Sequence, residues 1–429
     1  MAGRGRRRPR PTTAAGRSAP RRGKSIYDPI HGTITLADAP LALVGEPAFQ
    51  RLWGIRQTGF AHLVFPGANH TRLEHSLGVY WVARAMAERL ALPSAEARAV
   101  EAGALLHDLG HPPFSHTYDP TLLEVFGHGH EEISRSLIVG DDPSGAGIAA
   151  ILERSGIEPE RVADLVDPRK RSTNRPLLQS LLHGPVDADR IDYLQRDAHY
   201  TGVGHGAIDA VRLLDTVRSF RDRLAFAEKG RSALEGFLVG RSLMYASVYF
   251  HKTVRAAEVM AQAALERLAG YPDSARPLLR GTDGELLTTL ERGSGAAARL
   301  ARGLLDRRLH RRLAVYFPRD RSDLGRFRRL GGAPADRRGV EDELAAVIGA
   351  PAGAVLLDLS GLTPRAGVGS DFGDVILLDD GRATRPFRDH GLWRNFASLP
   401  PNRAPVSVYV ERGHTDAPVR IRRSFARLI

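Results

Sequence analysis

The residues with the clearest chemistry lie in the segment 102–116, which reads AGALLHDLGHPPFSH. An apolar run of helical character ends there at His107 and Asp108, and Gly110 and the two prolines that follow it stop the helix. Imidazole and carboxylate side chains together suit a borderline divalent cation such as Fe, Mn, Co, Ni or Zn. We therefore interpret His107 and Asp108 as part of a metal site that needs further ligands elsewhere in the chain.

A helix end with a satisfied histidine is the simpler interpretation of an isolated His-Asp pair. The residues on both sides of the pair argue against it, because scattered core histidines rarely gather beside carboxylates. These neighbours are His75, His111, His116, His128, His130, Asp187 and Asp189. The sequence therefore favours a metal site over a capped helix end.

Two further stretches place polar side chains at helical spacing. Arg72 and His75 are three residues apart at the start of a predicted apolar helix, so the histidine can hold a metal while the guanidinium holds a phosphate. Asp189, Tyr193 and Asp197 recur every four residues and form a polar stripe if their segment is helical. Such a stripe, facing a cleft, can bind a metal and a sugar. A solvated surface is the alternative interpretation of both stretches.

The sequence around these residues resembles the HD-domain metal-dependent phosphohydrolases, which share a His, a His-Asp pair and a later Asp. More specifically, it is similar to the deoxynucleoside triphosphate triphosphohydrolases (dNTPases), a branch that includes the SAM-and-HD-domain enzymes of animals. The resemblance runs from residue 24 to about residue 260 and weakens afterwards. The segments that carry it are 30–32 (IHG), 49–52 (FQRL), 64–68 (VFPGA), 72–78 (RLEHSLG), 107–116 (HDLGHPPFSH) and 189–197 (DRIDYLQRD).

The resemblance implies a reaction: attack on the α-phosphorus of a deoxynucleoside triphosphate (dNTP), which releases deoxynucleoside and inorganic triphosphate. It implies one divalent transition metal, with Mg²⁺ beside the substrate triphosphate as a further option, and a homo-oligomer, either a dimer or a tetramer. The implied metal ligands are His75, His107, Asp108 and Asp189. The implied catalytic residues are His130 as acid or base, Asp119 to orient it, and His111 and His116 in support. The implied substrate-binding residues are Gln57, Arg72, Asp187, Arg190, Tyr193, Asp197, Arg241 and Tyr249.

Several positions depart from the family pattern. Gly45 and Trp53 stand where guanine-activated members have an acid and an arginine, so the same activation mechanism is not expected here. Phe250 stands where the animal enzyme has a glutamine facing the base, so the base preference does not transfer. Arg190 replaces a common lysine, which keeps the charge and changes its geometry.

We expect a mainly α fold, with an all-helical HD-domain core and a small C-terminal α/β lobe. Residues 1–23 lack apolar periodicity and are predicted to be a disordered basic tail. The core is predicted over 24–270 and the C-terminal helical and α/β lobe over 271–429. Strands are predicted at 355–359, 375–378 and 406–410, with a turn at Asp380 and Gly381.

Local signals predict several boundaries inside the core. A short hairpin is expected around Ile34, and Pro47 is expected in the first turn of a helix. Ser94 is expected to be the N-cap of the helix that leads to the His-Asp pair. Residues 232–235 (SALE) predict a capping box that opens one long helix to about residue 269.

Composition limits the compartment and the partners. The 429 residues include no cysteine, which excludes disulfides and thiolate metal sites. No apolar run reaches the roughly 18–20 residues of a membrane span, so we expect a cytoplasmic protein. Nine of the 61 basic residues lie within residues 1–24, which have no acid, so most of the net charge of +12 belongs to the tail.

Two alternatives remain open at this stage. One is an HD phosphohydrolase that acts on nucleoside monophosphates or another nucleotide. The other is a nucleic-acid-binding protein that uses the basic tail and the Arg-rich segment 300–340, since clustered arginines bind phosphates with strong salt dependence. That segment has few aromatic residues for base stacking.

Overall fold

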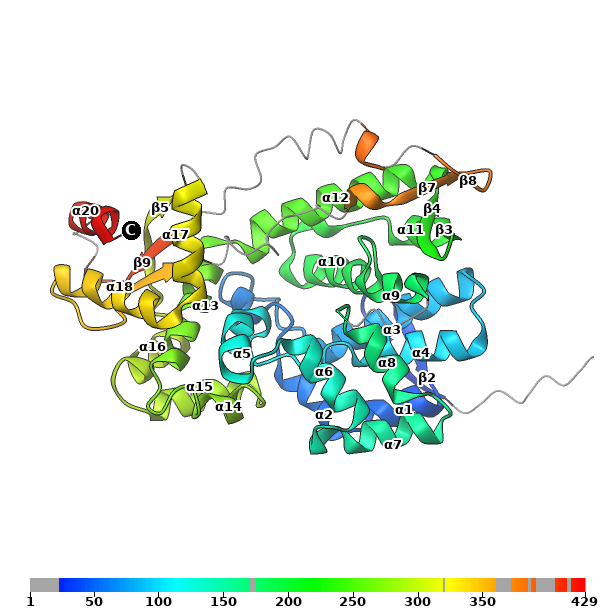
Figure 1. Ribbon diagram of the computed structural model, residues 1–429, viewed down its shortest axis with the longest axis horizontal. Helices are drawn as coiled ribbons and strands as arrows, with labels where there is room; N and C mark the ends of the chain where they lie inside the picture. The colour runs from blue at the N-terminus through cyan, green and yellow to red at the C-terminus, as the bar shows by residue number, and fades with distance from the viewer. Residues whose placement is uncertain are drawn as a thin grey trace, which may run out of the picture.

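Helices make up most of the chain that is described, and two antiparallel strand pairs interrupt them within the core (Figure 1). The structure is a computed structural model that describes residues 23–169, 175–318, 321–359, 372–384, 387–390, 406–414 and 418–428. The predicted tail, residues 1–23, lies outside the described residues except for Gly23. The mainly α class expected from the sequence is confirmed.

The N-terminal segment carries the strands and helices that lead to the first candidate ligands. They are β1 (Lys24–Asp28), β2 (Gly32–Leu36), α1 (Asp38–Val44), α2 (Pro47–Gln50), α3 (Arg72–Arg89) and α4 (Ser94–Leu106). The predicted hairpin is confirmed, because β1 and β2 pair antiparallel with Ile26 opposite Ile34. Pro47 begins α2 as predicted, but the chain tightens into a 3₁₀ turn from Arg51. The helix predicted to begin at Ser94 does begin there, but the N-cap is Pro93 and not Ser94, and it makes no side-chain capping hydrogen bond.

The central segment is helical and surrounds the His-Asp pair. Its helices are α5 (Asp119–Phe126), α6 (His130–Val139), α7 (Ala146–Arg154), α8 (Pro159–Val166), α9 (Pro176–His183) and α10 (Ala188–Thr201). The predicted polar stripe lies on α10, which Asp187 caps and Gly202 ends in a left-handed conformation. Helix α3 packs against both α4 and α10.

The next segment departs from the sequence prediction. It forms α11 (Ala210–Thr216), β3 (Val217–Phe220), β4 (Arg223–Ala227), α12 (Arg231–Met244), a π-helical turn (Tyr245–Tyr249) and α13 (Lys252–Glu266). The predicted capping box at Ser232 is wrong. The turn after β4 leads directly into α12, which begins at Arg231, so Ser232 lies inside the first turn of the helix. The single long helix is also broken, and His251 caps α13 separately.

The C-terminal part forms two groups of elements. Its helices are α14 (Ala275–Leu278), α15 (Asp283–Arg292), α16 (Gly295–Leu305), α17 (Arg321–Gly332), α18 (Pro334–Val347) and α20 (Pro418–Leu428). Its strands are β5 (Arg311–Tyr316), β6 (Val355–Asp358), β7 (Ile376–Asp379), β8 (Arg382–Ala383) and β9 (Val406–Val410). The three predicted strands are confirmed as β6, β7 and β9, and β5 lies in a segment for which only helices were predicted.

The two larger sheets lie at opposite ends of the molecule (Figure 1). One sheet has the order β5-β9-β6 and belongs to the C-terminal lobe. The other has the order β3-β4-β7-β8, in which β7 pairs parallel with β4 of the core. This second sheet crosses the boundary predicted at residue 270, because a strand from the last third of the chain returns to the core. Asp380 and Gly381 form the predicted turn, both with positive φ.

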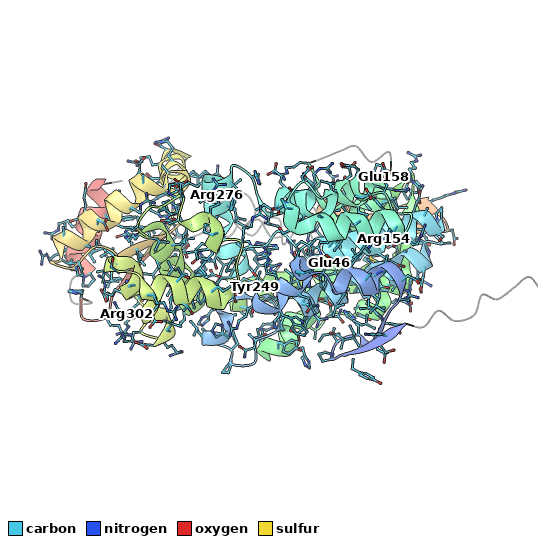
Figure 2. All side chains as sticks on the ribbon, turned by 90° about the horizontal axis from the view of Figure 1, so that it is seen from below. Glu46, Arg154, Glu158, Tyr249, Arg276 and Arg302 are labelled. Carbon is cyan, nitrogen blue, oxygen red and sulfur yellow. The ribbon has the colours of Figure 1, made fainter. Side chains whose placement is uncertain are left out.

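Two apolar clusters fill the core, and α3 and α4 contribute to both of them. On α3, Leu73 and Leu77 pack into one cluster, and Val79 and Val82 pack into the other. The side chains between these apolar positions are therefore held from two sides by close packing. Tyr249 lies near the middle of the long axis of the molecule (Figure 2). No helix in the described ranges has the length and apolar character needed to cross a membrane.

The crossing of α3 and α10 depends on Gly78. A Cβ atom at this position would lie 1.9 Å from Asp192 Oδ1 and 2.4 Å from Arg196 Nη2. We predict that Gly78→Ala lowers the free energy of unfolding by about 1–3 kcal/mol or more, because overpacking forces the two helices apart. Urea unfolding measures this. Gly236→Ala is the matched control, since Gly236 is helical and its Cβ would meet nothing within 4 Å. An equal loss in both variants would contradict the prediction.

Candidate metal centre

The His-Asp pair stands where α4 ends. His107 occupies the C-cap of α4, and the chain then turns through Gly110, whose missing side chain lets α6 approach. A Cβ at Gly110 would lie 2.1 Å from the carbonyl oxygen of His130. Ser134 of α6 fastens the turn, because its hydroxyl donates to the His107 carbonyl and accepts from the Gly110 amide, both at 2.8 Å. The turn is thus fixed by the helix that carries the candidate acid or base.

The four predicted metal ligands come from two helices, α3 and α10, and from this turn at the end of α4. His75, His107 and Asp108 each offer an atom within 4.8 Å of the others. His107 Nε2 lies 3.1 Å from Asp108 Oδ1, and His75 Nε2 lies 3.8 Å from Asp108 Oδ2. Asp189 on α10 joins them, with Oδ1 3.0 Å from His75 Nε2. The two imidazoles and the Asp108 carboxylate therefore surround one space, and the Asp189 carboxylate lies beside it in contact with His75.

The hydrogen bonds of the two histidines fit metal ligation. His75 Nδ1 donates to Asp192 Oδ2 at 2.8 Å, and His107 Nδ1 donates to the Ala104 carbonyl at 2.8 Å. Each ring is thereby fixed in the form whose Nε2 lone pair faces the other ligands. His107 Nε2 is buried and has no hydrogen-bond partner among the described residues. A divalent transition ion fits this donor set, and the identity of the metal is open among Fe, Mn, Co, Ni and Zn.

The local charge also favours a cation. Burial would raise the pKa of Asp108, but the charge of Arg72, with smaller contributions from His107 and His111, holds it well below its usual range, so the carboxylate is ionised. Burial would lower the pKa of His75, but hydrogen bonds with Asp189 and Asp192 raise it to about 10. The carboxylates around His75 thus stabilise a positive charge at Nε2, which a metal ion provides after displacing the proton.

An acid-base cluster lies beside the metal ligands. His130 Nδ1 contacts Asp119 Oδ1 at 3.2 Å, and His116 Nδ1 contacts Asp119 Oδ2 at 3.0 Å. His130 is buried, whereas the side chain of His116 is 68% exposed. His111 Nε2 lies 3.3 Å from Asp108 Oδ1 and so links this cluster to the metal ligands. All four predicted catalytic residues therefore meet at one edge of the centre.

The pKa values of the two buried histidines in this cluster are pushed apart. Burial lowers the pKa of His111 well below its usual value, and the positive charges of Arg72 and His130 add to this effect. Burial also lowers the pKa of His130, but the charge and hydrogen bond of Asp119 outweigh it and raise the pKa. The two imidazoles therefore differ in their affinity for a proton, a division that suits proton transfer.

His111, Asp119 and His130 also have ligand atoms within 4.8 Å of one another. Their arrangement favours proton transfer over a second metal. The rings of His111 and His130 stack, with centroids 3.8 Å apart and planes inclined by 24°. Ring nitrogens in stacked planes point their lone pairs side by side, so they do not converge on one ion. Both oxygens of Asp119 also contact histidines.

Three of the predicted substrate residues present buried polar atoms without partners among the described residues. These atoms are Gln57 Oε1, Arg72 Nη2, and Nε and Nη1 of Arg241. Arg72 donates from Nη1 to Asp108 Oδ2 at 2.5 Å, which places its remaining nitrogen beside the metal ligands. Unsatisfied buried donors are costly unless a ligand meets them, so the two guanidiniums indicate an anion.

Tyr193, Asp197 and Tyr249 form a second group. Tyr249 donates its hydroxyl to Asp197 Oδ2 at 2.5 Å, and the rings of Tyr193 and Tyr249 are 6.3 Å apart at their centroids. His70, which sequence reasoning missed, donates to Asp197 Oδ1 at 2.8 Å and stacks on Tyr200. The π-helical turn that ends at Tyr249 shifts this tyrosine to face α10, as such turns often do at functional sites.

The other two predicted substrate residues make structural contacts in this state. Asp187 is the N-cap of α10, where its buried carboxylate accepts from the Arg190 amide at 2.8 Å. The guanidinium of Arg190 donates to the carbonyl of Gly184. Their contact with substrate stays a prediction.

The sequence analysis also missed Asp192, which supports His75. Asp192 is fully buried and accepts from His31 Nε2 at 2.6 Å, from His75 at 2.8 Å and from Arg196 at 2.9 Å. These donors hold the pKa of Asp192 well below its usual range against the effect of burial, with Arg196 contributing most. The sequence does contain one indication of this role: Asp192 and Arg196 are four residues apart on α10, a spacing that predicts an ion pair.

We predict that Asp192→Asn weakens metal binding by roughly 10–100-fold, because the amide cannot accept from all three donors and His75 loses its fixed orientation. Metal affinity is measured by competition with a chelator of known affinity. Asp215→Asn is the control, since Asp215 is an exposed partner of Arg89. Unchanged affinity in Asp192→Asn would show that His75 needs no such support.

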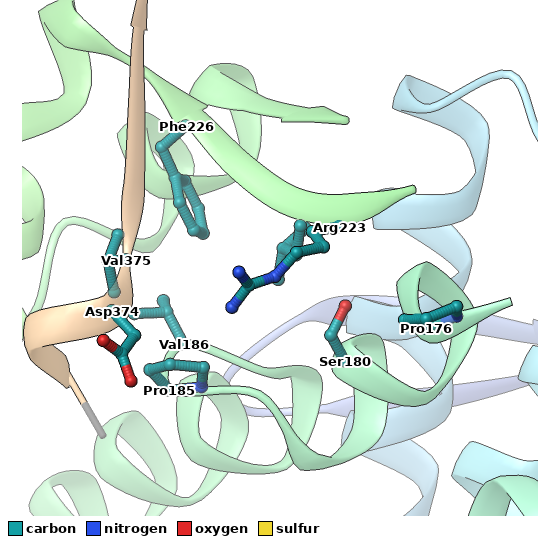
Figure 3. Close-up of a pocket in the computed structure, with 9 residues that line it drawn as sticks. Pro176, Ser180, Pro185, Val186, Arg223, Phe226, Asp374 and Val375 are labelled. Carbon is teal, nitrogen blue, oxygen red and sulfur yellow. The ribbon is translucent and has the colours of Figure 1, made fainter. Parts of the chain in front are cut away.

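A separate pocket of about 90 Å³ lies between α9, β4 and the segment before β7 (Figure 3). It is lined mainly by apolar residues such as Pro185, Val186 and Phe226, and the Arg223 guanidinium points into it while Asp374 lies at its edge. None of the predicted ligands or catalytic residues lines it. The chemistry of the molecule is therefore centred on the metal ligands and not on this pocket.

Comparisons with known proteins agree with this geometry. A family model of the HD domain matches residues 72–197, which include all four predicted metal ligands, and a model of the HD associated region matches residues 208–366. The chain is therefore similar to the HD-domain phosphohydrolases. Within them it is related to deoxynucleoside triphosphate triphosphohydrolases: human SAMHD1 is 34% identical over 211 residues, which are 42% of this chain and 34% of that protein.

Other relatives extend the match. The uncharacterised protein YwfO of Bacillus subtilis is 39% identical over 250 residues, which cover 57% of this chain and 55% of that protein. The chain spans about half the length of the first curated relatives it matches. The crystal structure of a hypothetical protein from Aquifex aeolicus superposes with a TM-score of 0.70 and 27% identity, and covers 94% of this chain and 100% of that one.

Proposed function

We propose that the protein hydrolyses deoxynucleoside triphosphates to deoxynucleoside and inorganic triphosphate. The observation that carries this proposal is the grouping of His75, His107 and Asp108 within ligand distance of one another, with Asp189 against His75 and the acid-base cluster directly beside them. The relation to enzymes named deoxynucleoside triphosphate triphosphohydrolases supports the choice of substrate.

The cationic side chains are placed to bind the triphosphate. Arg72 and Arg241 have buried guanidinium nitrogens free to donate, and each can orient phosphate oxygens by charge-assisted hydrogen bonds. A divalent ion held by the four ligands would polarise the α-phosphate and lower the pKa of a bound water. The two arginines then hold the phosphate chain while the bond between the α-phosphorus and the 5′ oxygen breaks.

His130 supplies the proton that the leaving deoxynucleoside needs. Asp119 raises the pKa of His130, which favours the protonated ring, and orients the ring through Nδ1. The proton then passes from His130 to the 5′ oxygen as the phosphorus–oxygen bond breaks.

The second group of residues would select the sugar. Asp197 and Tyr249, joined by their hydrogen bond, offer an acceptor and a phenol for the 3′ hydroxyl. The ring of Tyr249 would occupy the space of a 2′ hydroxyl and so exclude ribonucleotides. Gln57 presents a buried side-chain oxygen to the sugar from the opposite segment.

Analysis of phosphate products tests the proposal. The purified protein is incubated with each of the four dNTPs and the matching ribonucleotides, with Mn, Fe, Co or Mg, and with a second nucleotide present as activator. Release of triphosphate and deoxynucleoside from dNTPs supports the proposal. Release of monophosphate or no consumption of any dNTP contradicts it, and nucleoside monophosphates and other nucleotides are then the substrates to test.

A further inference from the structure

Two adjacent residues beside the metal ligands have a backbone conformation that side chains disfavour. Phe114 and Ser115 have φ angles of 54° and 57°, in the left-handed region where glycine is usual. Both are buried, and the ring of Phe114 stacks on that of Phe60 with centroids 4.1 Å apart. Such a turn persists only where its surroundings enforce it, and strained turns of this kind gather at functional sites.

The group that enforces the turn comes from the HD associated region. Asp283, the first residue of α15, is 3% exposed and accepts from the Phe114 amide through Oδ1 at 2.7 Å. Its Oδ2 accepts from the Arg56 amide at 3.1 Å. Asp283 is not needed to cap its own helix, because Thr282 and Glu285 form a complete capping box there. Its carboxylate instead binds the backbone amides of two segments that lie next to the metal ligands.

Ser115 connects this turn to Arg72 through hydrogen bonds. The Ser115 hydroxyl donates to the Arg56 carbonyl at 2.9 Å and accepts from Arg72 Nε at 2.7 Å. Arg72 then contacts Asp108 with one nitrogen and leaves Nη2 without a partner among the described residues. A chain of contacts thus runs from Asp283 to the guanidinium beside the metal ligands.

A second contact binds the same regions. Arg51 donates to the carbonyl of Gly281, next to α15, at 2.9 Å, and to the carbonyls of Leu109 and His111 at 2.6 and 2.8 Å. The turn that bears the candidate catalytic residues is thus held at both ends by the segment 281–283.

Burial disfavours the ionised form of the Asp283 carboxylate. Burial raises its pKa to about 6, against hydrogen bonds from Phe114 and Arg56 and the charges of Arg56 and Arg72. The charged groups that face it also include Arg51, which is buried nearby. An ionised carboxylate whose burial is unfavourable for stability is consistent with a role in the site.

We propose that Asp283 is a positioning residue of the site: it holds Phe114 and Ser115 in their left-handed turn, and so aims Arg72 at the phosphate of the substrate. This inference rests on the proposed function in so far as Arg72 is taken to bind phosphate. It makes the HD associated region part of the active site and not merely a neighbouring lobe.

Asp283→Asn and Ser115→Ala, as metal-loaded full-length proteins, test this inference. The rate of hydrogen exchange in peptides covering residues 112–118 measures the stability of the turn. Calorimetric titration with inorganic tripolyphosphate measures phosphate binding, which depends on the orientation of Arg72. Glu285→Gln is the matched control, since it removes a charge from the same helix turn while glutamine preserves the cap. Metal content is measured in every variant.

We expect faster exchange over 112–118 in Asp283→Asn only, and binding of tripolyphosphate weakened about tenfold in both test variants at unchanged metal content. Ser115→Ala, which leaves Asp283 intact, keeps the inference testable if Asp283→Asn does not fold. Unchanged affinity in Ser115→Ala, or equal exchange in Asp283→Asn and the control, would overturn the inference. A wild-type protein that binds no tripolyphosphate counts against the proposed function, and the exchange result then decides on Asp283 alone.

Discussion

Asp108→Asn is expected to abolish both metal retention and hydrolysis. Asp108 contacts two other candidate metal ligands, His107 and His75, and also Arg72, which is proposed to bind the substrate phosphate. An amide in its place is a poor metal ligand and leaves the buried guanidinium of Arg72 without a counter-charge. Since a metal supplies several kcal/mol of transition-state stabilisation, the rate should fall by about a thousandfold or more.

Two measurements check this expectation together. Elemental analysis gives the metal bound per chain, and product analysis gives the rate with each dNTP. Asp141→Asn is the control, because Asp141 is exposed in the loop after α6 and makes none of these contacts. A variant that retains its metal and its rate would remove Asp108 from the ligand set.

The candidate metal ligands could be predicted from the sequence because the patterns that point to them are local. His107 and Asp108 are adjacent, and His75 and Asp189 stand in segments with their own recognisable spacing. Helical periodicity also places Arg72 beside His75 and Asp197 beside the rest of the stripe. Each of these relations spans only a few residues, so it can be inferred before the fold is known.

The supporting residues could not be found in this way, because their roles depend on packing. Asp192 supports His75 only because Gly78 lets α10 approach α3. Asp283 meets Phe114 across 169 positions of sequence, and β7 returns to pair with β4 from the last third of the chain. Long-range contacts of this kind leave no local pattern. The wrong capping box at Ser232 has the same origin, since the preceding hairpin sets where α12 begins.

His130→Gln is expected to lower kcat by about 10²–10⁴-fold while metal content stays unchanged, because it removes the proton donor without touching a metal ligand. The pH profile gives the sharper result. The pKa of His130 is raised by Asp119, so the protonated and active form prevails below that raised pKa and is lost as the pH rises through it. Wild-type activity should therefore fall on the alkaline side.

The alkaline fall should disappear in His130→Gln, and the remaining activity should become flat there. His128→Gln is the control, because His128 lies two residues earlier, outside the contacts with Asp119. Asp119→Asn should move the alkaline fall to lower pH, since the charge that raises the pKa of His130 is gone. An alkaline fall that persists in His130→Gln would assign the titrating proton to another group and leave His130 without an acid role.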